Sequence, residues 1–238
     1  MGNQWFQFKQ FRINQDKTAM KVGTDGVLLG AWTSIPDKGR VLDIGTGTGL
    51  IALMVAQRNS KVKITAIDIE PDAYKQAIEN VEESKFSDSI EVICESLSNY
   101  TLHDNEKFEL VVCNPPFYNT LNPGNDRKRA IARHSESLEL NELISIAAKI
   151  LSSTGIMSLI LPSEQLDLLE KLIFENGLHL HRLTYVKPTP VKDAHRVLVQ
   201  IGFKQMPIDI STLVIEEFGR HQYSDEFKSF VAPFYLKI

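Results

Sequence analysis

Strand-like and helix-like segments alternate along the chain from residue 40 onward, and this rhythm is the strongest constraint on the fold. Segments with apolar residues at helical spacing are GLIALMVAQRN, PDAYKQAIENVEES and ELNELISIAAKIL. Between them lie apolar runs typical of buried strands, namely RVLDIG (40–45), KITAID (63–68), IEVICE (90–95), ELVVCN (109–114) and GIMSLILP (155–162). Repeated strand–helix–strand units predict an α/β fold, a parallel sheet covered by helices on both faces.

The last third of the chain has a different pattern. The strand-like runs HRLTYVKP (181–188) and HRVLVQIGFK (195–204) are separated only by a short loop that contains proline. No crossover helix fits there, so we expect these two strands to be antiparallel. STLVIEE (211–217) predicts one further strand, and the aromatic residues of SDEFKSFVAPFYLKI recur at helical spacing, which predicts a tail that docks on the body.

Residues 1–39 do not follow the alternating pattern. FKQFRINQ predicts a small strand or hairpin, and TDGVLLGAW predicts a short helix capped by Thr24, with Asp25 near its positive end. A later helix, SEQLDLLEKLIFENG, has Ser163 as its expected N-cap and Gly177 as its expected stop. We expect a single domain over residues 1–238, with 1–39 as a flap on a core of residues 40–238.

The composition is that of an ordinary globular protein, with 43% hydrophobic and 24% charged residues. The sequence lacks a long apolar run and a secretory N-terminal pattern. A net charge of −4 argues against indiscriminate nucleic-acid binding but leaves room for a local basic patch. Cys94 and Cys113 each lie in a strand-like run, so we expect reduced core cysteines in a cytoplasmic protein.

A glycine-rich loop, VLDIGTGTGL, joins the first core strand to its helix. Gly45, Gly47 and Gly49 allow a sharp turn and close approach of a ligand, and the helix N-terminus offers free N–H groups to a carboxylate or phosphate. A dinucleotide fingerprint would need Gly or Ala where this chain has Leu50, which disfavours an oxidoreductase. A glycine-rich turn without any ligand is the remaining alternative.

Acidic residues end the next two strands. Asp68 lies about twenty residues past the loop, where a carboxylate can accept both ribose hydroxyls of an adenosine group. Glu95 ends the third strand and is a weaker candidate for the adenine amino group, because Ser96 or Leu97 can instead lie against the ring. Glu70 reads as a solvated or helix-capping acid. The order of these motifs over residues 40–165 resembles the class I S-adenosylmethionine-dependent methyltransferases.

The sequence NPPF ends the fourth strand at the same sheet edge. Asn114 and Pro115 each precede a proline, which restricts both to extended conformations. The result is a stiff arc that presents two acceptors, the Asn114 side-chain oxygen and the Pro115 carbonyl. A planar amino group with two donors matches this pair, and adenine N6 is such a group.

Two hydrogen bonds to such an amine would draw electron density onto nitrogen and favour attack on a methyl sulfonium. Holding the two reactants in line would contribute roughly 7–11 kcal/mol. Phe117 would stack on an unpaired or extruded base, a contact worth about 1–3 kcal/mol. The motif serves amino groups of adenine, cytosine or glutamine in the resembled superfamily. A structural turn with Phe117 in the core is the alternative.

The flanking segments add a more specific resemblance. FKQFRINQDKTAMKVGTDGVLLGAW (8–32), VLDIGTGTGL, NPPF, ARHSESLELNELISIAAKIL and the terminal YSDEFKSFVAPFYLKI are similar to the bacterial tRNA1(Val) (adenine(37)-N6)-methyltransferases over nearly the whole chain. The resemblance implies a Rossmann-like, mostly parallel seven-stranded sheet and a cytoplasmic, monomeric enzyme that uses S-adenosylmethionine and tRNA. It implies roles for residues in three motifs: Lys21, Thr24 and Asp25 around the methionine part; Asp43, Gly45, Gly47 and Gly49 in the loop; and Asn114, Pro115 and Phe117 around the adenine.

Basic residues suggest an RNA path in two places. The segment after NPPF carries Arg127, Lys128, Arg129, Arg133 and His134. Lys187, Lys192, His195 and Arg196 lie on or near the predicted antiparallel pair. Charged loops are often only solvated surface, which is the alternative for both groups. We predict no metal site, because His134 and His195 lack partners at ligand spacing.

Other classes fit the sequence less well. A DNA adenine methyltransferase usually needs an added recognition region, and little of the chain is left over for one. A glutamine methyltransferase for release factors carries a sizeable helical domain before its glycine loop, where this chain has only residues 1–39. A non-enzymatic binding module would not need Asn114 and Phe117.

Overall fold

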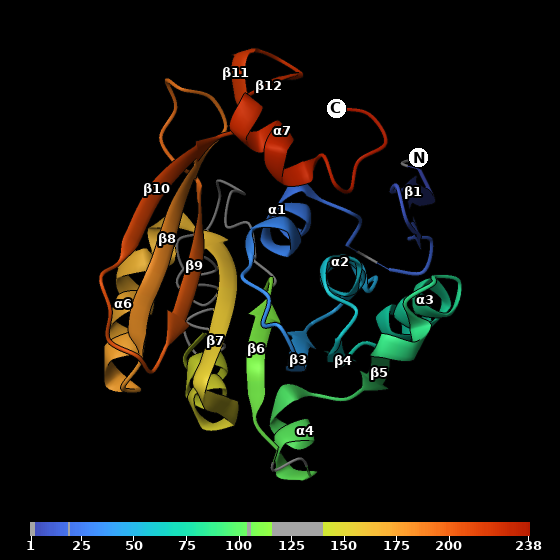
Figure 1. Cartoon of the computed structure of the whole chain (residues 1–238), viewed down its shortest axis with the longest axis vertical. Helices are drawn as coiled ribbons and strands as arrows, with labels where there is room; N and C mark the ends of the chain where they lie inside the picture. The colour runs from blue at the N-terminus through green and yellow to red at the C-terminus, as the bar shows by residue number, and fades with distance from the viewer. Residues whose placement is uncertain (1–2, 19, 104–105, 116–139) are drawn as a thin grey trace, which may run out of the picture.

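The computed structural model describes residues 3–18, 20–103, 106–115 and 140–238. Its centre is an eight-stranded sheet in the order β10-β8-β9-β7-β6-β3-β4-β5 (Figure 1). The strands are β3 (Gly39–Ile44), β4 (Val62–Asp68), β5 (Ile90–Cys94), β6 (Phe108–Cys113), β7 (Leu151–Pro162), β8 (His179–Lys187), β9 (Arg196–Gly202) and β10 (Asp209–Val214). Neighbouring strands run parallel except where β9 pairs with β7 and β8, so the predicted antiparallel pair is confirmed.

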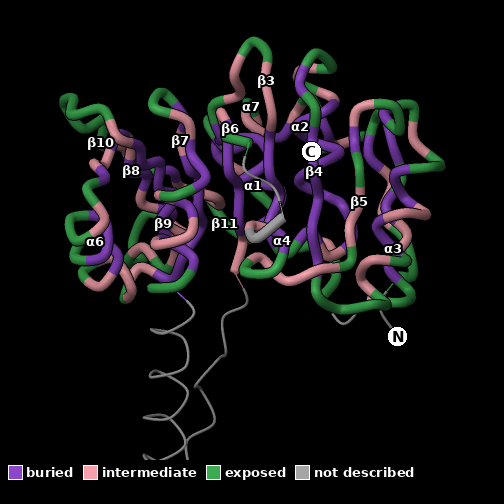
Figure 2. Tube along the Cα trace, turned by 90° about the horizontal axis from the view of Figure 1, so that it is seen from below, coloured by how far each residue is buried: buried purple, intermediate pink, exposed green. Residues whose placement is uncertain are grey.

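Helices cover both faces of the sheet, because the strand side chains alternate between two apolar clusters. Val41 and Leu110 join one cluster, whereas Leu42 and Val111 join the other. The helices on the first face are α1 (Thr24–Trp32), α2 (Leu50–Arg58), α3 (Pro71–Glu82) and α7 (Asp225–Val231). Those on the second are α4 (Leu97–His103), the helical residues 140–150 and α6 (Leu166–Glu175). In Figure 2 the buried residues follow the central strands.

Several expectations about the fold need correction. The sheet has eight strands instead of seven, because β10 adds to β8 in parallel. The run 211–217 divides between β10 and a separate small hairpin of β11 (Glu216–Gly219) and β12 (Gln222–Tyr223). Helix α4 was not expected. Cys113 is buried as predicted, but Cys94 is exposed, because it ends the outermost strand β5.

The predicted helix caps are also different. Gly23, and not Thr24, occupies the N-cap position of α1. Ser163 begins a short 3-10 helix (Ser163–Gln165), and its hydroxyl donates to the Ala194 carbonyl at 2.7 Å. A second 3-10 helix precedes β5 (Ser87–Ser89). The predicted stop at Gly177 is confirmed, since its φ of 67° lies in the left-handed region that ends helices.

The two ends of the described chain pack together. The hairpin of β1 (Trp5–Gln7) and β2 (Arg12–Asn14) confirms the predicted N-terminal hairpin. Phe8 forms an isolated antiparallel bridge with Tyr235, and Lys9 N–H donates to the Phe234 carbonyl at 2.8 Å. Figure 1 shows both termini on the side of α2 and α3. The C-terminal segment therefore docks on the body, as its aromatic spacing predicted.

The segment after β2 is fastened to α3 by buried amide side chains. The Gln76 side-chain oxygen accepts from Lys17 N–H at 2.9 Å, and the Gln15 side-chain oxygen accepts from Val22 N–H at 2.8 Å. Both amides are buried. These bonds fix the path of the chain from the hairpin to the start of α1.

Asn80 joins this segment to the turn that follows β3. Its side-chain oxygen accepts from Asn14 N–H at 2.7 Å, and its Nδ2 donates to the Asn14 carbonyl at 2.9 Å and to the Thr48 carbonyl at 2.8 Å. The side chain is only 1% exposed. One buried amide therefore connects helix α3 with two separate segments.

We expect Asn80→Ala to destabilise the fold, because it leaves three backbone groups without their partner. Each buried polar group left unsatisfied typically costs about 1–3 kcal/mol, so the free energy of unfolding should fall by at least that amount. Urea unfolding measures it. Glu82→Ala, at an exposed position of the same helix, is the control. An Asn80→Ala variant as stable as the control would contradict this role.

Candidate active site

The turn between β3 and α2 has a left-handed backbone at three glycines. Gly45, Gly47 and Gly49 have φ values of 66°, 59° and 80°, a region that side-chain-bearing residues rarely adopt. A Cβ added to Gly45 or Gly47 would meet no described atom within 4 Å. The turn therefore presents bare backbone to open space, which is the arrangement that lets a ligand approach closely.

Three buried polar side chains hold this turn. Asp43 Oδ2 accepts from the Thr46 hydroxyl at 2.7 Å and from Ala52 N–H at 3.1 Å. Asp68 Oδ2 accepts from Gly47 N–H at 2.8 Å. Asn80 holds the Thr48 carbonyl from the side of α3, as described above. The turn is thus fixed from β3, β4 and α3.

Asp43 is completely buried, and its environment disfavours the charged form. Burial raises the pKa of the Asp43 carboxyl from its ordinary value of 3.8 to about 7, against the hydrogen bonds from Thr46 and Ala52, which lower it. Its second oxygen, Oδ1, has no hydrogen-bond partner among the described residues. Asp43 therefore supports the turn from its buried side, and it does not line the cavity beside the turn.

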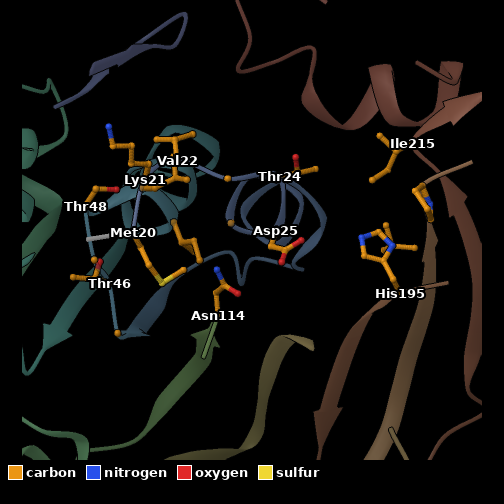
Figure 3. A pocket seen from close by; sticks show the side chains of 18 of the residues that line it. Met20, Lys21, Val22, Thr24, Asp25, Thr46, Thr48, Asn114, His195 and Ile215 are labelled. Carbon is orange, nitrogen blue, oxygen red and sulfur yellow. The ribbon is translucent and has the colours of Figure 1, made fainter. Parts of the chain in front are cut away.

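A cavity of about 450 Å³ opens beside the turn (Figure 3). One side is formed by the turn and by the segment leading into α1, with Lys21, Thr24 and Asp25 among its lining residues. The opposite side comes from the C-terminal strands and includes His195 and Ile215. The cavity lies where β3 is flanked by β4 on one side and β6 on the other, the switch point at which open α/β sheets bind ligands.

Asn114 lies between the two sides, directly after β6. Figure 3 shows its side chain pointing from the end of the strand into the space between Met20 and Asp25. Its Oδ1 atom is buried and has no hydrogen-bond partner among the described residues. Pro115 follows, partly buried. A buried amide oxygen without a partner favours a donor supplied by a ligand.

Asp25 and Arg196 connect the two sides of the cavity. Arg196 Nε donates to Asp25 Oδ2 at 2.8 Å, and both side chains are largely shielded, at 23% and 30% exposed. The structure therefore gives Arg196, expected on the RNA path, a partner on helix α1. Lys21 is exposed, and its Nζ donates to the Asn3 carbonyl at 3.5 Å.

The remaining predicted site residues lie around this cavity or outside the described chain. Asp68 is buried beside the turn, and its Oδ1 accepts from Glu70 N–H at 3.0 Å. Glu95 is partly buried, and its N–H donates to the Asp68 carbonyl at 3.0 Å. Neither lines the cavity, and Lys192 is exposed on the loop before β9. Phe117, Arg127, Lys128, Arg129, Arg133 and His134 lie outside the described residues.

Sequence reasoning missed two groups of residues at this site. Asn80 and Gln76 face the core from α3, and their four-residue spacing beside apolar Ala77 and Val81 was the available signal. The second group is the C-terminal side of the cavity, Val186, Pro188, Ile215 and Glu216. No motif marks those residues.

Known proteins match both the sequence and the fold. The family model "Methyltransferase small domain" matches residues 21–173. A tRNA1(Val) (adenine(37)-N6)-methyltransferase from Parabacteroides distasonis is 43% identical over the whole of both chains, and one from Trichodesmium erythraeum is 42% identical over the same extent. The chain belongs to the tRNA1(Val) (adenine(37)-N6)-methyltransferase family. The family and the class of enzyme predicted from the sequence are thereby confirmed.

Solved structures support the same fold. A predicted O-methyltransferase from Agrobacterium tumefaciens superposes with a TM-score of 0.69 at 21% identity, covering 88% of this chain and 96% of that one. TrmN from Thermus thermophilus gives a TM-score of 0.59 at 18% identity, covering 79% of this chain and 51% of that one. The Rossmann-like methyltransferase fold expected for the family is confirmed.

In the part of the chain that the structure describes, every helix is too short or too polar to span a bilayer.

The Asp43 carboxyl predicts a specific pH dependence of stability. Its pKa of about 7 in the folded protein exceeds 3.8, so the folded state holds a proton that the unfolded chain has already released. Stability should therefore fall as pH rises between about 4 and about 7, by at most about 1.4 kcal/mol per pH unit. Asp43→Asn cannot titrate, so the difference in unfolding free energy between variant and wild type should change over this range. If the free energies of unfolding of the two proteins, measured by urea, changed with pH by the same amount, that result would contradict the burial argument.

Proposed function

We propose that this protein transfers the methyl group of S-adenosylmethionine to N6 of an adenine in tRNA, and that this adenine is nucleotide 37 of tRNA1(Val). The observation that carries the chemistry is the buried Oδ1 of Asn114, which has no hydrogen-bond partner among the described residues and lies in a cavity beside a left-handed glycine turn. The printed name of the full-length relatives supports the choice of tRNA and of the nucleotide. A tRNA substrate also supports a cytoplasmic enzyme.

The residues around the turn fit the proposed cofactor. Gly45 and Gly47 leave room that a Cβ would fill, and the first turn of α2 begins beside them, with Leu50 and Ile51 lining the cavity. The N–H groups of a helix N-terminus suit the carboxylate of the methionine part. Lys21, Thr24 and Asp25 lie on the same side and would enclose it.

Asp68 and Glu95 would hold the adenosine part from the neighbouring strand ends. Both Asp68 oxygens already accept one backbone N–H, but a carboxylate offers about four acceptor positions, so the ribose hydroxyls still have sites to bind. Asp68 would then have two tasks, to fix Gly47 and to bind ribose. Glu95 N–H donates to the Asp68 carbonyl, so the two residues are neighbours at the ends of β4 and β5.

Asn114 and Pro115 would orient the amine that receives the methyl group. When bound, the cofactor supplies a methyl group activated by a positively charged sulfur. Asn114 Oδ1 and the Pro115 carbonyl would each accept one hydrogen bond from the amine, which directs the nitrogen lone pair toward that methyl group. Such positioning lowers the barrier chiefly by removing translational and rotational freedom before reaction. Phe117 would stack on the base.

The RNA path remains part of the proposal. Arg127, Lys128, Arg129 and Arg133 would neutralise phosphates near the catalytic turn, and Lys192 would do so beside β9. Because each phosphate contact releases counterions, such contacts make RNA affinity depend on salt. Arg196 fits a different task better, because its guanidinium already holds Asp25.

The substrate is tested by methyl transfer from labelled S-adenosylmethionine to unmodified total tRNA, to DNA and to a release factor. We expect label in tRNA alone, recovered as N6-methyladenosine after digestion to nucleosides. A tRNA1(Val) transcript with guanine at position 37 should then accept no label, whereas the unchanged transcript should. Label in DNA or in the release factor, with none in tRNA, would overturn the proposal.

Asn114→Ala tests the catalytic role. We expect kcat to fall by about a hundredfold or more, as is typical when a preorganised hydrogen-bonding group is removed from an active site. The Kd for S-adenosylmethionine should stay near the wild-type value, because the turn that would hold the cofactor is unchanged. Asn99→Ala, at an exposed amide on α4, is the matched control. Full turnover in Asn114→Ala would refute the role assigned to this oxygen.

A further inference from the structure

The side of the cavity opposite the glycine turn is formed by Val186, Pro188, His195 and Ile215, which we call the far wall. Backbone hydrogen bonds that extend the pairing of β8 with β10 hold it together. Ile215 N–H donates to the Lys187 carbonyl at 2.9 Å, and Glu216 N–H donates to the Pro188 carbonyl at 3.0 Å. The far wall is therefore an extension of the sheet.

His195 is held at this wall through its own backbone. Its N–H donates to the Val186 carbonyl at 3.2 Å, and its carbonyl accepts from Ser163 N–H at 3.3 Å and from Arg196 Nη1 at 3.0 Å. Figure 3 shows the ring on the same side of the cavity as Ile215, across from Asn114 and Asp25. The exposed imidazole is thus carried by a backbone that is fixed on both sides.

The ion pair between Arg196 and Asp25 ties the far wall to helix α1. Its 2.8 Å bond joins the first residue of β9 to the first turn of the helix that leads out of the flap. His195 immediately precedes Arg196. A direct contact between β9 and α1 therefore holds the residue next to His195 against Asp25, which lines the cavity.

The chemistry of the far wall suits a flat, uncharged ring. Although His195 is exposed, the partial burial of its ring and then the positive charge of Arg196 lower its pKa below the ordinary value of 6.5, while Asp25 acts in the opposite direction. The neutral form of the imidazole is therefore favoured at neutral pH, and Val186 and Ile215 add aliphatic surface. A phosphate would instead meet the carboxylate of Glu216, which lines the same cavity.

We infer that the far wall binds the acceptor nucleobase, with the His195 ring stacked against the face of the base whose amino group meets Asn114. This inference rests on the proposed function and adds a base-contacting residue from the C-terminal strands. The base would enter between the two sides of the cavity, with its edge toward β6 and its face toward β9. Stacking on an aromatic side chain tolerates different bases, so His195 would position the base while Asn114 selects its amine.

The test compares His195→Ala and His195→Phe with the control Val191→Ala, an exposed residue of the same loop. We expect His195→Ala to lower kcat/KM for tRNA by roughly tenfold, as loss of one base-stacking contact implies. Most of this decrease should come from kcat, because contacts elsewhere on the protein still bind the RNA. His195→Phe should retain most of the activity, since it restores a flat ring, and Val191→Ala should leave kcat near the wild-type value.

Two further measurements separate a base contact from a structural role. The Kd for S-adenosylmethionine and the unfolding midpoint of His195→Ala should match those of wild type. A tRNA anticodon stem-loop with 2-aminopurine in place of the acceptor adenine should change its fluorescence on binding to wild type and to His195→Phe. The change should be smaller with His195→Ala. A similar loss in both variants would indicate a structural role and overturn the inference.

The outcomes also distinguish this inference from the proposed function. If wild type methylates tRNA and His195→Ala does so equally well, only the inference fails. If wild type methylates DNA instead, the proposed function fails, and the same variants measured on DNA decide the role of His195. If wild type methylates only the release factor, both the proposed function and the inference fail. A wild type without methyl transfer to any of the three acceptors would overturn both.

Discussion

The left-handed turn after β3 is the constraint on which the rest of the site depends. Three glycines adopt backbone angles that other residues avoid, and a buried side chain from each of three elements holds the turn in place. Asp43, Asp68 and Asn80 make hydrogen bonds that would be costly to lose in a buried setting. The bare backbone at Gly45 and Gly47 is therefore rigid as well as open, which is what close binding of a small charged ligand requires.

The sheet brings a second, separately built side to this turn. β6 lies next to β3, so Asn114 emerges beside the turn, and the antiparallel strand β9 brings His195 and Arg196 across from it. The ion pair of Arg196 with Asp25 then joins the two sides directly. A cavity with different chemistry on its two sides follows from this arrangement, and a methyl donor and a methyl acceptor need such a pair of sides.

Much of the fold could be predicted from the sequence, because short-range patterns determine it. The core strands, the antiparallel pair and the glycine turn were all expected from spacing and composition. Apart from the N-cap of α1 and the unexpected helix α4, the failures involve long-range contacts. Ser163 bonds to Ala194 instead of capping α6, and Cys94 is exposed only because β5 is the last strand of the sheet. Val186, Pro188 and Ile215 of the far wall were missed for the same reason, since the pairing of β8 with β9 and β10 brings them together, whereas His195 was expected near the RNA path.

This difference has a consequence for how the two sides of the cavity can vary. The proposed donor side is encoded in compact motifs, so a substitution at Gly47 or Asp68 disturbs a turn that several elements hold at once. The acceptor side depends on side chains that project from a stable sheet, where His195 can be exchanged without changing the backbone bonds that carry it. The position of the acceptor can therefore change at the far wall while the geometry of the donor side and the choice of amine by Asn114 stay the same, so one fold can serve acceptors of different shape.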